Sequence, residues 1–497
     1  MNKIYKIFFF IIFLLSNFHL KKRTSINNHC SLFYRKKNEF FEKGERNFFI
    51  EKIESNCEYD KGATNYYKEN ESNEINENRN HFNSFYEDNN SKLNKLKDEF
   101  NFRSLGKLKC PGYPRLLALS KYWNNTWLLG GNDGNRVICR RSIDNGNHWT
   151  DPVEISKHPK HICSNVDFFE LPNHDIISSY RAIGNPLSRF KEIKYNRRLC
   201  SSISHDGGKT WEDLGVIIDN FDLAKKLGKS KSSAIEACKK ENRIGFFEPF
   251  VEMINKEVTV FYADDFTTMI LEVVNNNPMD NYRTQNIYSQ TFNINLKKWR
   301  NERNLIMDGT KKKSPTGSGL IKRISRDGMP VVSKMKDGTY ILVFEGTYRD
   351  IDYPLLTGSK LKEYHWFEIL LSYSRDGLNW SNPVEVYTPK YNGSKSSAPF
   401  VVSNEKNQLI ISFQTDEDSI TSGFAGDCYS IMKVMISKPN ITIQNINNNS
   451  FYALCNNNNS PIGGSSIWNG MMIIKNTLYT CSSDNVIKYS KIPIYEE

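Results

Sequence analysis

Charged residues recur at the ends of apolar strands along this sequence of 497 residues, and they are the residues best suited to chemistry. Strand starts carry Arg115, Asp167, Glu248, Arg326 and Asp327, and the ends of the following strands carry Asp133, Arg181, Asp264, Asp265, Glu345, Arg349, Asp416, Glu417 and Asp484. Carboxylates that gather in one cavity raise one another's pKa values, because burial and like charge both disfavour the ionised form. Such a cavity has the composition of a general acid/base site; the alternative is a polar channel mouth filled with water and ion pairs.

A repeated pair of apolar strands joined by a polar turn must position these residues. Six copies begin at Tyr113, Asn165, Phe247, Gly328, Ala398 and Gly464. Their starts lie roughly 50 to 80 residues apart. In an antiparallel hairpin the start of the first strand and the end of the second lie at the same end. Six such hairpins predict an all-β fold, a six-bladed β-propeller over residues 102–497, in which the charged ends converge on the central channel.

Three short motifs predict tight turns within this fold. Residues 142–149 and 204–211 share the pattern Ser-x-Asp-x-Gly-x-x-Trp, and residues 374–380 repeat it with one residue fewer. The aspartate can accept hydrogen bonds from the turn's own amides, and glycine supplies a positive φ. Asp144, Asp206 and Asp376 are therefore expected to be turn residues and not catalytic acids. The motif resembles the Asp-box of the sialidase and Asp-box (BNR) superfamily of β-propellers, where it joins the two outer strands of a blade.

Two glutamate motifs resemble those of the six-bladed exo-α-1,5-L-arabinanase family of glycoside hydrolases. One is Gly245-Phe-Phe-Glu248-Pro-Phe250, and the other is Tyr340-Ile-Leu-Val-Phe-Glu345, which follows Arg326-Asp-Gly-Met-Pro330. The resemblance covers residues 113–418 in pieces; the long basic insertion between the two motifs, the extension and the weakly matching last blades depart from it. It implies that Glu248 and Glu345 are the catalytic pair of a retaining hydrolase, with carboxyl groups about 5 to 5.5 Å apart. It implies a carbohydrate substrate and neither a metal nor a cofactor.

Six further charged residues at the same strand ends are candidates for binding the substrate. They are Arg115, Arg181, Asp265, Arg326, Asp133 and Asp167. Arginine can bind hydroxyl or carboxylate groups through several donors, and an aspartate beside the catalytic pair can orient or repel one glutamate.

Two other functions fit the same residues. The first is a sialidase, because Tyr113-Pro-Arg115 places an arginine before the first strand and three arginines could clamp a sialic acid carboxylate. In that family a tyrosine is the nucleophile and an aspartate, here Asp133 or Asp167, is the acid/base, but no tyrosine is clearly marked. The second is a secreted module that binds a glycan or a protein and has lost turnover, since propellers carry many functions.

The N-terminal part of the chain predicts export. Residues 1–23 have the pattern of a signal sequence, with an apolar core at residues 7–15 that is too short for a typical membrane-spanning helix. This pattern predicts either secretion or a signal anchor, and no further membrane span. Residues 24–101 are polar and lack periodicity, which predicts a mostly disordered extension. The ten cysteines suit an oxidising compartment and predict disulfides.

The net charge of +11 lies largely in the N-terminal segment and in two insertions, residues 221–242 and 301–325, which we expect to be basic loops. With no recognisable nucleic-acid-binding fold, this distribution argues against a nucleic-acid partner and leaves a protein partner for the extension or the loops.

The last blade is expected to borrow a strand. Few residues follow its hairpin, so residues 106–109 should complete it, because an open sheet edge is a liability. A disulfide between Cys110 and Cys481 would then lie at the junction.

Overall fold

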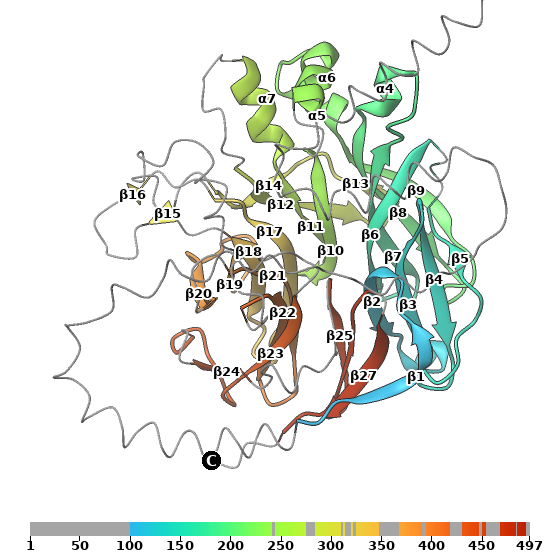
Figure 1. Ribbon diagram of the computed structural model, residues 1–497, viewed down its shortest axis with the longest axis vertical. Coiled ribbons are helices and arrows are strands. Elements are labelled where there is room, and N and C mark those ends of the chain that lie inside the picture. Colours follow the sequence, from blue (N-terminus) through green and yellow to red (C-terminus); the bar gives the residue numbers. More distant parts are fainter. Residues whose placement is uncertain are drawn as a thin grey trace, which may run out of the picture. The chain divides into compact units, whose positions relative to one another are not determined.

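Six antiparallel sheets, each built on one of the predicted hairpins, form the core of the computed structural model (Figure 1). The structure describes residues 100–493 except for 157, 159, 241–243, 275–283, 310–311, 314–319, 322–324, 347–366, 390–393, 418–429, 447–449, 454–467 and 484. The predicted signal sequence and the extension as far as residue 99 lie outside these ranges, as do Arg349 and Asp484. No helix within the described ranges is long and apolar enough to cross a membrane.

The strands follow sequence order within each of the first five sheets. The first sheet contains β2 (Gly112–Ala118), β3 (Trp127–Asp133), β4 (Arg136–Ser142) and β5 (Val153–Glu154). The second contains β6 (His161–Glu170), β7 (Ile176–Gly184), β8 (Arg197–Ser204) and β9 (Glu212–Asp219). The third is β10 (Phe246–Ile254), β11 (Glu257–Asp264), β12 (Asn286–Asn293), β13 (Lys298–Trp299), with β14 (Asn304–Met307) also on β12. The fourth is β17 (Gly328–Lys334), β18 (Tyr340–Gly346), β19 (Glu368–Ser374), β20 (Val384–Tyr387), and the fifth is β21 (Ser396–Ser403), β22 (Leu409–Thr415), β23 (Ile431–Ser437), β24 (Phe451–Ala453). A separate short hairpin joins β15 (Lys312–Lys313) to β16 (Leu320–Ile321).

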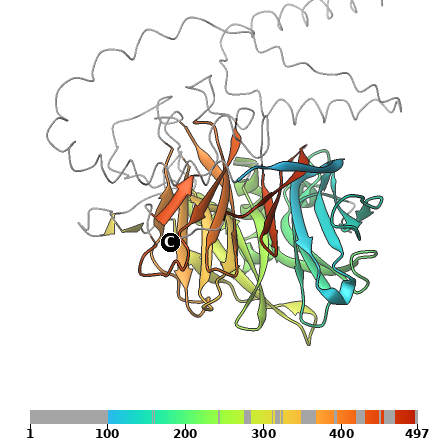
Figure 2. The same cartoon turned by 90° about the horizontal axis from the view of Figure 1, so that it is seen from below.

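The innermost strands of the six sheets pack against one another in a closed circle. The order is β2, β6, β10, β17, β21 and β25 (Gly470–Ile474), and β25 returns to β2. The second strands β18 and β22 are buried along their whole length between neighbouring sheets. This closure confirms the predicted six-bladed propeller, which Figure 2 shows from a second direction.

The sixth blade joins the two ends of the described chain. Its strand order is β25, β26 (Thr477–Cys481), β27 (Val486–Lys491) and then β1 (Arg103–Lys109), and Leu105 pairs with Ile487. The expectation that residues 106–109 complete this blade is therefore confirmed. The predicted disulfide between Cys110 and Cys481 is wrong, because Cys481 is a free thiol whose Sγ donates to Gly470 O at 3.5 Å.

Three turns with the Ser-x-Asp pattern share one arrangement of hydrogen bonds. In the second turn, Ser204 Oγ accepts from Gly208 N at 2.8 Å and Asp206 Oδ1 accepts from Thr210 N at 2.9 Å. The turns at residues 142–149 and 374–380 repeat both bonds, and there the tryptophan indole donates to the carbonyl of the turn glycine. Each turn joins the third and fourth strands of its blade. The three aspartates are turn residues, as the motif predicts.

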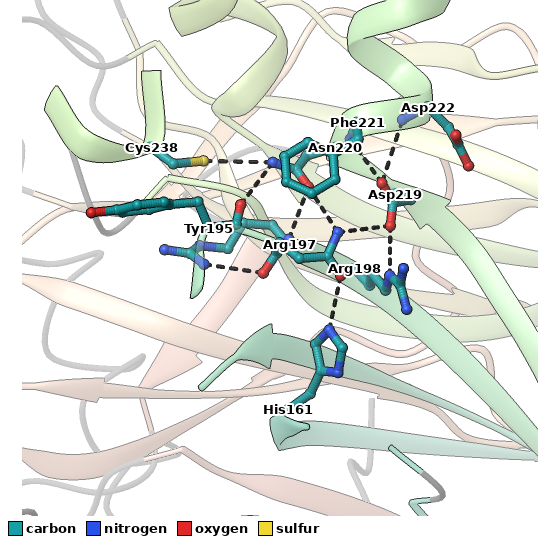
Figure 3. Close-up of polar contacts among 10 residues, drawn as sticks. His161, Tyr195, Arg197, Arg198, Asp219, Asn220, Phe221, Asp222 and Cys238 are labelled. Atoms are coloured by element: carbon teal, nitrogen blue, oxygen red, sulfur yellow. Dashed lines mark hydrogen bonds and ion pairs between the residues drawn. The ribbon is translucent and has the colours of Figure 1, made fainter. Parts of the chain in front are cut away.

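The basic insertion at residues 221–242 is largely helical and not a loop. It forms most of α5 (Asn220–Lys226) and all of α6 (Lys231–Lys240), whose alanines and Cys238 are buried against the second and third blades. Asp219 ends β9 and caps α5 by accepting from Phe221 N at 2.8 Å. Asn220 Oδ1 accepts from Arg197 N at 2.9 Å, so the first turn of α5 is attached to β8 (Figure 3). Figure 1 shows α4 (Lys191–Lys194) and α7 (Phe266–Val274) at the same end of the molecule.

Candidate active site

One residue near the start of the innermost strand in every blade has a left-handed backbone. These residues, called the axial ring here, are Tyr113, Asn165, Glu248, Met329, Ala398 and Trp468, with φ between 44° and 57°. In the first five blades the strand register shifts at this residue, as it does at a β-bulge. A left-handed backbone is uncommon for residues other than glycine, and bulges redirect side chains near functional sites. Side chains from four blades meet here, because Tyr113, Met329, Ala398 and Trp468 pack in one cluster.

A second set of residues lines the same end of the channel from the second strands. The residue before each axial-ring position pairs with Asn132, Arg181, Ala263, Glu345 and Gln414 in the first five blades. Three of these five are acceptors for the axial-ring amide of the next blade.

The acceptors differ in charge although they make the same bond. Asn132 Oδ1 accepts from Asn165 N, Glu345 Oε2 accepts from Ala398 N and Gln414 Oε1 accepts from Trp468 N, each at 2.9 Å. A neutral amide is therefore sufficient for this bond between blades. A buried carboxylate costs free energy that an amide does not. Glu345 is only 6% exposed, and the bond between blades does not require its charge. The charge is therefore better explained by a catalytic role than by a structural one.

Glu248 belongs to the axial ring and is within electrostatic reach of Glu345. Its carboxylate accepts a hydrogen bond from Met329 N. Burial, and after it the charge of Glu345, raises the pKa of Glu248 to about 7, although Arg326 and Arg181 oppose the shift. A carboxyl group with this pKa can give or take a proton near neutral pH, as a general acid/base must.

Two of the predicted binding residues, Arg181 and Arg326, act on Glu248, and both also act on a third, Asp265. The guanidinium of Arg181 lies 4.1 Å from the ring centroid of Phe247, and both Arg181 and Arg326 act electrostatically on Glu248 and on Asp265. Asp265 Oδ1 accepts from Gly245 N at 2.7 Å, and burial raises the pKa of this aspartate to about 7. Asp265, which follows β11, therefore shares both arginines with Glu248.

Two other predicted binding residues, Arg115 and Asp167, pair with each other. Each comes two positions after an axial-ring residue, directly after the register shift of its strand. Arg115 Nε is 3.7 Å from Asp167 Oδ1, and Asp167 Oδ2 also accepts from Val251 N at 2.8 Å. Both residues are buried, and the Arg115 guanidinium lies 5.1 Å from the ring of Phe400. This buried ion pair, called the channel floor here, joins the innermost strands β2 and β6 of the first two blades.

Asp133 is not brought to the glutamate pair. Its side chain is exposed and pairs with Arg136 at 2.9 Å on the surface. Side chains alternate across a strand, so the residue beside it, Asn132, faces the channel in its place. Asp264 and Glu417 also have structural partners: Arg303 and Thr267 contact Asp264, and Lys433 contacts Glu417.

Sequence reasoning missed the axial ring itself and the neutral acceptors Asn132 and Gln414. The missed signal is a proline directly after the ring residue in four copies of the repeat, at positions 114, 249, 330 and 399. Among the described residues, no group of three or more histidine, cysteine or acidic side chains has an arrangement that could hold a metal ion.

Comparisons with known proteins agree on the fold. No protein-family model matches the chain, and no curated protein is similar in sequence. Among solved structures, the chain resembles the GH93 α-L-arabinofuranosidase of Fusarium graminearum with arabinobiose (17% identity, 78% of this chain and 97% of that one, TM-score 0.47). It also resembles an α-L-arabinanase of Penicillium chrysogenum with arabinobiose (17%, 78% and 98%, 0.48) and a protein of unknown function from Dyadobacter fermentans (10%, 79% and 97%, 0.50). At these identities the likeness concerns the fold, and function has to be argued from the site.

Proposed function

We propose that this protein is a glycoside hydrolase that cleaves glycans with Glu248 and Glu345 as its catalytic pair, by the retaining route. The observation that carries the proposal is the buried carboxylate of Glu345 at a position where Asn132 and Gln414 make the same bond as neutral amides. The raised pKa of Glu248, about 7, adds a second carboxyl suited to proton transfer at neutral pH.

The reaction needs both glutamates in two steps. One carboxylate attacks the anomeric carbon while the other, protonated, gives its proton to the leaving oxygen, so that the glycosidic bond breaks and a glycosyl ester forms. In the second step the deprotonated partner takes a proton from water, whose oxygen attacks the anomeric carbon and releases the first carboxylate. We propose that Arg181, Arg326 and Asp265 bind the sugar hydroxyls and balance the charge of the pair.

The charge distribution favours a neutral sugar over a sialic acid. Arg115 is paired with Asp167 in the channel floor, whereas Arg181 and Arg326 act on Glu248. The two arginines beside the glutamates face carboxylates already, which leaves less positive charge for a substrate carboxylate. α-L-Arabinofuranosides are therefore the first substrates to test.

The test is hydrolysis of 4-nitrophenyl α-L-arabinofuranoside and arabino-oligosaccharides, with 4-nitrophenyl sialoside in parallel. We expect release of arabinose as the α-anomer first, observed by proton NMR, and no cleavage of the sialoside. If no glycan is hydrolysed and the protein only binds arabino-oligosaccharides, the enzyme proposal is wrong and a binding module replaces it.

We also propose that the protein enters the secretory pathway through residues 1–23 and is secreted or anchored there. The support is the basic and apolar pattern of this segment. Full-length protein should appear in the medium or in the membrane fraction of a eukaryotic host, whereas a variant lacking residues 1–23 should stay in the cytosol.

A further inference from the structure

Tyr113 has a buried hydroxyl group with no hydrogen-bond partner among the described residues. The side chain is 1% exposed, and its oxygen neither donates nor accepts within the described ranges. Most buried polar side-chain atoms in proteins have a partner, and leaving one unpaired is costly. An unpaired hydroxyl that persists beside a candidate active site is therefore a sign that its partner is a ligand.

Tyr113 lies close to the two glutamates in the fold. Tyr113 and Glu248 are both axial-ring residues, so their backbones have the same left-handed conformation in the first and third blades. The tyrosine packs in one cluster with Met329 and Ala398, whose amides donate to Glu248 and Glu345. The two glutamates and the tyrosine thus meet at one level of the channel.

The ring of Tyr113 is held in place from two sides. The guanidinium of Arg115, in the channel floor, lies 4.3 Å from the ring centroid. The ring of Trp468 lies beside it, with centroids 6.0 Å apart. A side chain restrained in this way keeps its hydroxyl at a fixed place, which is the preorganisation that a binding site requires.

The electrostatic surroundings keep this hydroxyl a donor. Burial raises the pKa of Tyr113 above its ordinary value, and the charges of Glu248, Asp167 and Glu345 raise it further, although Arg115 opposes them. The phenol therefore stays protonated throughout the range in which Glu248 titrates.

We propose that the Tyr113 hydroxyl donates a hydrogen bond to an oxygen of the sugar unit held between Glu248 and Glu345. This inference rests on the proposed function and deepens it by naming a donor for the bound sugar. A sugar oxygen in that place supplies the missing acceptor. When a hydrogen bond between a buried site group and a substrate is lost, kcat/KM for that substrate typically falls by a large factor.

The variant Tyr113→Phe separates this role from a structural one, because activity and stability should change in opposite directions. We expect kcat/KM to fall by about 10- to 100-fold, since the donor to the substrate is gone. We expect the melting temperature of the free protein to stay the same or rise by about 1 to 4 °C, since an unsatisfied hydroxyl is removed.

Tyr340→Phe is a matched control. Tyr340 is also buried, but its hydroxyl accepts from Asn255 N at 3.0 Å, and it starts β18 at the opposite end from Glu345. This variant should lower the melting temperature and leave kcat/KM unchanged. A fall in stability with unchanged kcat/KM for Tyr113→Phe as well would overturn the inference.

Binding without turnover distinguishes failure of this inference from failure of the proposed function. In Glu345→Gln protein, calorimetry with arabinotriose should show affinity at least tenfold weaker when Tyr113→Phe is added. If the single variant binds and the double variant binds equally well, Tyr113 is not a donor to the sugar, and the proposed function stands. If wild-type protein neither hydrolyses nor binds arabino-oligosaccharides, the proposed function is wrong and the inference falls with it.

Discussion

Replacing Glu345 by glutamine tests the site most directly, because the structure contains its own precedent for that change. Gln414 already accepts an axial-ring amide at 2.9 Å in the next blade, as Glu345 does from Ala398. Glu345→Gln therefore keeps the bond between blades and removes only the charge and the proton. The stability change should be below about 1 kcal/mol, which corresponds to a melting-temperature shift of less than about 4 °C.

The activity of Glu345→Gln should fall much further than its stability. Loss of a nucleophile or general acid typically costs on the order of 10²- to 10⁴-fold in rate, or about 3 to 5 kcal/mol of transition-state stabilisation. Initial rates on 4-nitrophenyl α-L-arabinofuranoside and thermal unfolding followed by circular dichroism measure the two effects. Glu345→Ala should lose both activity and stability, because Ala398 N then has no acceptor. The free energy of unfolding should fall by about 1 to 3 kcal/mol more than in Glu345→Gln.

The matched control for this prediction is Glu252→Gln. Glu252 lies on the same strand as Glu248, and burial likewise raises its pKa to about 7. It lies outside the axial ring, so this variant should keep wild-type activity. Hydrolysis by Glu345→Gln within about threefold of wild type, or equal losses in both glutamine variants, would refute the reasoning from blade equivalence.

Three further predictions follow from the same geometry. The pKa values of Asp167, Glu248 and Asp265 are raised to about 6 to 7 in the folded protein. Such carboxyls stabilise the fold fully below their unfolded pKa near 4 and lose this contribution as the pH rises through about 6 to 7. The melting temperature should therefore be higher at pH 5 than at pH 7.5, and a flat profile would contradict this. Gly328→Ala would place a Cβ 3.2 Å from Glu345 Oε1 and 3.3 Å from Gln285 Oε1, so kcat/KM should drop by about tenfold. Gly112 holds the same position in the first blade, where the closest contact of a Cβ would be 3.6 Å, so Gly112→Ala should leave kcat/KM unchanged. With azide, Glu248→Ala and Glu345→Ala should give glycosyl azides of opposite anomeric configuration, as determined by NMR, because a retaining pair has one nucleophile and one acid/base; identical products would exclude that division of roles.

The sequence was sufficient to predict the six blades and their closure by β1, because hairpin periodicity and turn chemistry are local. It predicted the glutamate pair as a candidate through short motifs, and that assignment stays a prediction. Asp133 was chosen for its charge, but side chains alternate along β3, and it is Asn132 that contacts the axial ring. The helices of the basic insertion were missed because they are short and depend on tertiary burial of Ala234 and Cys238. The predicted disulfide between Cys110 and Cys481 was wrong because the sequence can indicate that two cysteines lie near each other but not whether they are bonded.

The pairing of β1 with β27 also sets an order for biosynthesis. β1 is the first propeller strand to leave the ribosome and its partner is the last, so five sheets can assemble during translation while the sixth waits for residues 486–491. Until then the chain carries a free strand and an unpaired sheet edge, features that chaperones recognise and that favour aggregation. Trp468, which flanks Tyr113, also arrives in this final stretch. A chain that stops before residue 468 therefore lacks both the closed ring of blades and the Trp468 ring beside Tyr113, so the same stretch of chain completes the fold and this part of the candidate site.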